Sequence, residues 1–206
     1  MKSFSAKTCC FILIFFIVSC SGTKLTQKQV NENFIGKPVS NILVIGIAHN
    51  PEKRISFENR FVAQLRAAGI EAVSSAEVIP MPPELKLEKK DIIDVVKKFQ
   101  NDAVIVTHVK SIEDKFIHTQ GSPTLTSYYS YYGGVYGYVN SPGYTDTSKV
   151  VRLQTKLYDV KTEQLMWSGE SKTWNIDSEK EIMNDVIKTV IEDLQKNKML
   201  SIKTSD

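Results

Sequence analysis

The sequence lacks an apolar run long enough to cross a membrane. Its longest run, 9–18 (CCFILIFFIV), has ten residues, whereas a helix needs about twenty to span the hydrocarbon core. Lys2 and Lys7 precede this run, and the small residue Ser19 follows it. A charged start, a short apolar core and a small residue are the three parts of an export signal. We therefore expect residues 1–19 to be a cleaved signal peptide.

Cysteine is also scarce. The chain has three cysteines: Cys9 and Cys10 lie inside the apolar run, and Cys20 follows Ser19. Cleavage before Cys20 leaves one cysteine, which excludes a disulfide within the mature domain. Two alternatives remain open at this point. The segment could be an ordinary secretory signal with Cys20 as a bystander, or a short uncleaved anchor.

The stretch 17–20 (IVSC) resembles the lipobox of bacterial lipoproteins. In those proteins the cysteine is lipidated on its thiol and becomes the new N-terminus. The resemblance implies lipidation at Cys20 and attachment to a membrane through its acyl chains, which hold almost permanently when there are several. Ser21 follows, whereas an aspartate there favours retention at the inner membrane. The resemblance therefore implies the periplasmic face of the outer membrane.

A large excess of charge of either sign is missing. The chain has 26 basic and 23 acidic residues, and removing the two lysines of the signal leaves 24 against 23. A mature chain so close to neutrality argues against nucleic acid as a partner.

Motifs of catalysis and of metal or nucleotide binding are absent. There is no H-x-x-H, H-E-x-x-H, paired-cysteine, G-x-S-x-G, G-x-G-x-x-G or G-K-[ST] pattern. We therefore expect no catalytic residue, metal or cofactor, and histidines at the surface or at sheet edges. His49 and His118 follow two predicted strands, and ligands of open α/β sheets gather at strand ends. A histidine-dependent or metal-dependent envelope hydrolase thus remains an alternative.

Hydrophobic periodicity predicts an α/β domain over residues 41–200, followed by a tail over 201–206. The mostly polar segment 20–40 is expected to be a tether, which for about twenty residues extends roughly 25 Å. The domain should begin with parallel strands and helices in the order βαβαβ. The expected elements are a strand over 41–48, a helix from Asn50-Pro51 to Gly69, a strand over 70–74, a helix around 92–99 and a strand over 102–109.

The rest of the chain predicts an antiparallel hairpin and a closing helix. Two extended runs, 149–160 and 164–174, are joined by a tight turn at 161–163. Ser178 and Glu181 form a capping box before the final amphipathic helix. The prediction is a mixed sheet of about five strands with three helices. Arg54 and Glu58, one helical turn apart, are expected to form an ion pair on a solvated face.

This order of elements, with 157–160 (LYDV) leading to 166–168 (MWS), resembles a group of small bacterial lipoproteins of uncharacterised function. Their domain is similar to the N-terminal domain of the Tol-pathway B protein. The lipoprotein activator of penicillin-binding proteins and the curli secretion lipoprotein share the broad architecture. The resemblance implies an envelope location and a fold, and it transfers no catalytic residues because fold does not settle function.

The segment 126–148 holds seven of the eight tyrosines together with four glycines. One interpretation is a flexible loop or long β-hairpin whose tyrosines fold back on the sheet or remain solvent-exposed. The other is a docking surface for an envelope protein or a peptidoglycan-associated partner, because tyrosine gives large contact area at small entropy cost. The candidate partner-binding residues are Tyr128, Tyr129, Tyr131, Tyr132, Tyr136, Tyr138 and Tyr144.

The resulting prediction is a noncatalytic, lipid-anchored periplasmic protein that binds an envelope partner. Besides the hydrolase, a second alternative is a subunit of an oligomeric export or transport assembly.

Overall fold

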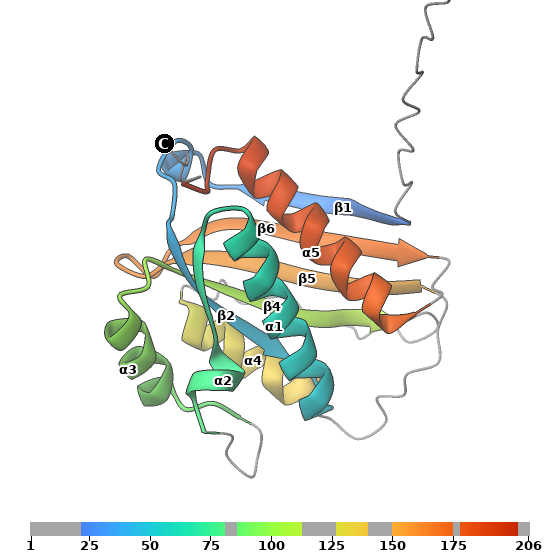
Figure 1. Ribbon diagram of the computed structural model, residues 1–206, viewed down its shortest axis with the longest axis horizontal. Coiled ribbons are helices and arrows are strands. Elements are labelled where there is room, and N and C mark those ends of the chain that lie inside the picture. Colours follow the sequence, from blue (N-terminus) through green and yellow to red (C-terminus); the bar gives the residue numbers. More distant parts are fainter. Residues whose placement is uncertain (1–21, 81–85, 113–126, 140–149, 175–177, 202–206) are drawn as a thin grey trace, which may run out of the picture.

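The computed structural model describes residues 22–80, 86–112, 127–139, 150–174 and 178–201. For Ile112, Tyr138 and Val139 it describes the backbone alone. These residues form a six-stranded mixed sheet in the order β1-β6-β5-β4-β2-β3, with helices on both faces (Figure 1). The strands are β1 (Thr23–Val30), β2 (Asn41–Ile47), β3 (Glu71–Ser74), β4 (Ala103–Ile112), β5 (Val150–Asp159) and β6 (Leu165–Trp174). The helices are η1 (Glu32–Phe34, a 3₁₀ turn), α1 (Pro51–Ala67), α2 (Ser75–Val78), α3 (Lys89–Phe99), α4 (Tyr128–Val139) and α5 (Glu179–Lys196).

The predicted βαβαβ unit is present, and the α/β class is confirmed. β2 pairs in parallel with β3 on one side and with β4 on the other. Asn50 caps α1 by accepting a hydrogen bond from the backbone N–H of Lys53 at 3.0 Å. Gly69 follows the helix at φ +82°, the left-handed conformation that glycine adopts without strain. Within the described residues the sheet has one strand more than the expected five, and α2 and α4 add to the three expected helices.

The hairpin of β5 and β6 is antiparallel, as predicted. A bulge in β6 leaves Met166 as an extra residue between the pairs Leu157–Trp167 and Tyr158–Leu165. The fully buried ring of Trp167 lies across Gly169, where an added Cβ would approach the ring to 2.3 Å. Glycine at this position therefore allows the indole to pack flat on its own strand.

The prediction that residues 20–40 form a tether is wrong for most of the described part of this segment. β1 lies within the segment 20–40 and pairs antiparallel with β6 from Thr23–Thr173 to Val30–Trp167. Its side chains are largely polar because it is an edge strand with little apolar surface to bury. Figure 1 shows that β1 begins at the end of the sheet where β6 finishes. The sheet therefore includes residues from Thr23 onward, ahead of the expected start of the domain at residue 41. Residues 1–21, with the predicted signal and Cys20, lie outside the described part.

The expectation of a loop or β-hairpin over 126–148 is wrong for its described part, 127–139. Tyr128–Val139 form α4, which packs on the sheet face opposite α1 and α5 (Figure 1). Its buried residues recur at helical steps, and the burial of this stripe offsets the low helix propensity of Gly133 and Gly137. The buried residues of α4 are Tyr128, Tyr131, Tyr132 and Val135.

The sheet separates two hydrophobic cores. α1 and α5 cover one face and pack on a cluster that includes Phe61, Leu157 and Trp167. α3 and α4 cover the other face, over Leu43 and Val104. None of the helices among the described residues is both long and apolar enough to cross a membrane.

Candidate functional site

A cavity of about 240 Å³ lies at the carboxyl end of β2 and beside the second half of β4, between the sheet and the first turns of α1 and α5. Its inner wall includes the apolar side chains of Phe57, Val109 and Leu153. Polar groups of Lys53 and Glu179 stand on its rim. Ligands of open α/β sheets bind at this end of the strands, so the cavity is the first candidate site.

The two helix starts fix the rim of the cavity. Lys53 Nζ of α1 lies 2.6 Å from Glu179 Oε1 of α5, which ties the first turns of the two helices together. At the start of α5, Ser178 Oγ accepts a hydrogen bond from the backbone N–H of Glu181 at 3.2 Å. The predicted N-cap at Ser178 is therefore confirmed, and the rim is built on two capped helices.

The histidines do not form a cluster in the described part of the chain. His49 is exposed beside the cavity, as expected for a surface histidine. His118, its proposed companion, lies outside the described residues. Across the described ranges there is also no group of three or more His, Cys, Asp and Glu side chains that could hold a metal ion.

His108 is buried, so its expected surface or edge position is wrong. It lies on β4, an interior strand, on the face that α4 covers, and its exposed fraction is 5%. Its Nδ1 is 2.9 Å from the Tyr131 hydroxyl. Burial lowers the pKa of His108 to about 3, and the nearby Lys156 and Lys110 add to this shift. The imidazole is therefore neutral at physiological pH, since its charged form would be desolvated.

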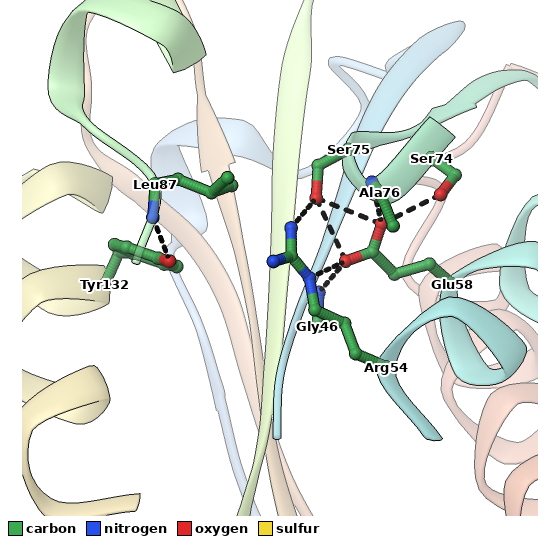
Figure 2. Close-up of polar contacts among 8 residues, drawn as sticks. All are labelled: Gly46, Arg54, Glu58, Ser74, Ser75, Ala76, Leu87 and Tyr132. Carbon is green, nitrogen blue, oxygen red and sulfur yellow. Dashed lines mark hydrogen bonds and ion pairs between the residues drawn. The ribbon is translucent and has the colours of Figure 1, made fainter. Parts of the chain in front are cut away.

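The ion pair of Arg54 and Glu58 exists but is buried, so its predicted place on a solvated face is wrong. Arg54 Nε lies 2.9 Å from Glu58 Oε1, and the exposed fractions of these residues are 3% and 0%. Figure 2 shows the Glu58 carboxylate at the centre of a polar network. It accepts hydrogen bonds of 2.7–3.0 Å from the backbone N–H groups of Gly46 and Ala76, the hydroxyls of Ser74 and Ser75, and Nε of Arg54.

This network satisfies a backbone N–H group of β2 that has no partner on β3. The pairing of β2 with β3 ends at Val44–Ser74, so the N–H of Gly46 points past the end of β3. The Glu58 carboxylate supplies the acceptor that the strand no longer provides. A Cβ at Gly46 would lie 3.3 Å from Glu58 Cγ, so glycine allows this close approach. The network thus holds β2, α1 and α2 together.

The structure divides the tyrosines proposed to bind a partner. Tyr128, Tyr131 and Tyr132 are buried against the sheet, so they are core residues and the predicted contact role is wrong for them. Tyr132 also accepts a 2.7 Å hydrogen bond from the backbone N–H of Leu87 (Figure 2). Burial raises the pKa of the Tyr132 hydroxyl. Tyr144 and the side chain of Tyr138 lie outside the described part.

Tyr129 and Tyr136 remain half-exposed on α4, where lysines approach their rings. Lys89 Nζ lies 4.4 Å from the ring centroid of Tyr129, and Lys86 Nζ lies 6.0 Å from that of Tyr136. A hollow of about 430 Å³ separates α3 from α4 beside these residues. We name Lys86, Lys89, Tyr129 and Tyr136 the lysine–tyrosine surface. Lysine over aromatic rings gives a surface both cationic and apolar character.

No protein-family model matches the chain, and no curated protein matches it significantly. The solved structures similar to this chain include two of PelC from Paraburkholderia phytofirmans, both described as dodecamers. One, a point variant, is 12% identical with a TM-score of 0.44, covering 86% of this chain and 98% of that chain. The other is 12% identical with a TM-score of 0.45, covering 87% and 99%. A likeness at this level transfers no function.

Neither the cavity nor the contacts of Lys86 and Lys89 were predicted from the sequence, although the sequence contains part of the pattern that marks the cavity. Val109 and Val151 are apolar residues at the exposed ends of predicted strands, where polar residues usually stand, and both line the cavity. Lys86 and Lys89 precede the second predicted helix, but nothing local ties them to tyrosines some forty residues later. That contact depends on α4 folding back over the sheet.

Proposed function

We propose that this chain is a noncatalytic lipoprotein of the bacterial envelope, cut before Cys20, anchored by acyl chains on that cysteine, and binding an envelope partner at the membrane surface. The observation that supports it most is the position of β1. The strand begins at Thr23, three residues after Cys20. Three residues extend about 10 Å, so an anchor on Cys20 would hold the folded domain close to the lipid headgroups.

The partner would bind the lysine–tyrosine surface. Half-exposed aromatic rings under lysines, beside a hollow, have the composition of an interface that combines apolar contact with charge. The periplasmic face of the outer membrane fits Ser21 after the lipidated cysteine. The partner would be a protein or a peptidoglycan-associated assembly.

Lipidation is tested by metabolic labelling with an alkyne-bearing palmitate. We expect the wild-type chain to be labelled and Cys20→Ser to lose at least nine tenths of the label, because the thiol is the acceptor. Cys9→Ser and Cys10→Ser are matched controls and should be labelled like the wild type, since those residues leave with the signal. Equal labelling of Cys20→Ser, or a product that retains Met1, would refute the anchor.

Partner binding is tested by photocrosslinking in cells. A photoreactive residue at Tyr129 should give discrete products of higher mass, because this ring is half-exposed on α4. The control is the same residue at Ile55, which is 39% exposed on α1 at the other face of the sheet. Adding Lys89→Ala to the Tyr129 probe should reduce the products severalfold. Identical patterns from the two probe positions would count against the lysine–tyrosine surface. Deleting 126–148 is not a usable test, because it removes core residues.

A further inference from the structure

The cavity beside α1 and α5 is apolar where a soluble protein would usually present polar groups. Four half-buried side chains, Val109, Val151, Ile182 and Met183, line it. They come from β4, β5 and α5, and they pack only partly on the core cluster behind them. Half-buried apolar groups around an open cavity favour an apolar ligand, because such a ligand removes their remaining surface from water.

The cavity lies at the end of the domain where the chain enters it. β1 starts at this end, because Thr23 pairs with Thr173 near the finish of β6, and Val150 at the start of β5 pairs with Trp174. Figure 1 shows the start of α5 at the same end. With Cys20 only three residues before Thr23, an anchor would bring this end to the bilayer.

The geometry points to a lipid site: the cavity binds the end of an acyl chain of a phospholipid from the bilayer beneath the domain. This inference rests on the proposed anchor. The side chains of Phe57, Val109 and Leu153 offer hydrocarbon contacts, as an acyl chain requires. Lys53 and His49 at the rim place polar groups where the chain would leave the cavity toward its headgroup. A volume of about 240 Å³ holds part of one chain and not a whole lipid.

Such a site would give the domain one orientation on the membrane. The acyl anchor alone is a single point about which the domain can turn. A second contact with the same bilayer removes that freedom, as two linked binding events do in general. The lysine–tyrosine surface, on the other face of the sheet, would then point in a constant direction toward its partner.

The test is photocrosslinking of the full lipidated protein, reconstituted in phosphatidylcholine vesicles that contain a phospholipid with a diazirine near the end of one acyl chain. We expect adducts on peptides that include Val151 or Met183. Met183→Trp fills the mouth of the cavity and should reduce these adducts at least tenfold. The matched control, Ile55→Trp, adds the same side chain to the outer surface of α1 and should leave them unchanged.

Two further results would overturn the inference. Adducts spread evenly over the domain, or unaffected by Met183→Trp in a protein that keeps its melting temperature, would show that the cavity is not the site. If Cys20 is acylated and no adducts form, bilayer lipid does not enter the cavity. The acyl chain on Cys20 could, for instance, fill it instead. If Met183→Trp unfolds the protein, Met183→Ala replaces it and should increase the adducts by enlarging the cavity.

The same sample separates this inference from the proposed function, because mass spectrometry of its N-terminal peptide reports acylation independently. A chain without acyl groups refutes the anchor. The cavity is then tested on that chain with dodecanoic acid carrying a terminal diazirine. Labelling at Val151 or Met183 that Met183→Trp abolishes would support an acyl-chain site, and labelling elsewhere would refute it.

Discussion

Glu58→Ala lowers the free energy of unfolding by about 3–5 kcal/mol, the usual cost of removing one partner from a buried ion pair. The loss is large because Glu58 is fully buried and its carboxylate accepts from five donors. Its removal leaves the Arg54 guanidinium without its carboxylate inside the protein, and it also removes the acceptor of the Gly46 N–H. Pulse proteolysis in urea measures the effect as a decrease of the unfolding midpoint.

The control is another glutamate in an i,i+4 pair. Lys188 Nζ and Glu192 Oε1 on α5 are 3.9 Å apart, with side chains about 60% exposed. Glu192→Ala should change the free energy of unfolding by less than about 0.5 kcal/mol, since exposed pairs contribute little. Arg54→Met combined with Glu58→Leu should be less destabilising than Glu58→Ala, because it leaves no buried charge. Equal effects of Glu58→Ala and Glu192→Ala would contradict the role assigned to the network.

The burial of this ion pair could have been predicted from the sequence. Arg54 and Glu58 stand at three- and four-residue steps from Phe57, Phe61 and Leu65, so they share the buried stripe of α1. The i,i+4 spacing on which the prediction was based does not by itself distinguish an exposed pair from a buried one. What the sequence does not contain is the set of donors, since Gly46, Ser74 and Ser75 come together only when β2, β3 and α1 pack.

The secondary-structure elements differ in the same way: some follow from a local pattern in the sequence, and others depend on tertiary packing. Runs such as 41–48 are predicted well because a strand buried on both faces must be apolar along its whole length. β1 has no such pattern: it is an edge strand, and a register shift between Leu25 and Gln27 interrupts its alternation. In α4 the helical spacing of Tyr128, Tyr131, Tyr132 and Val135 was in the sequence. Glycine content favoured a loop, and tertiary burial overrode that local preference.

His108→Gln should make the stability of the protein much less sensitive to acid. In the folded chain burial holds the pKa of His108 near 3, whereas in the unfolded chain it is 6.5. Between these two values the unfolded state binds a proton that the folded state does not. The wild type therefore loses about 1.4 kcal/mol of stability per pH unit as the pH falls from 6.5 toward 3, and this residue costs nothing above that range.

At pH 4.5, two units below the unfolded pKa, the contribution amounts to roughly 3 kcal/mol. The measurement compares unfolding midpoints at pH 7.5 and pH 4.5, where carboxylates contribute equally to both proteins and cancel in the difference. Glutamine keeps a polar group near the Tyr131 hydroxyl, which lies 2.9 Å from His108 Nδ1. His49→Gln, at an exposed position, is the control and should keep the acid sensitivity of the wild type. If His108→Gln loses as much stability as the wild type over this interval, His108 is charged in the folded protein and α4 does not exclude water from it.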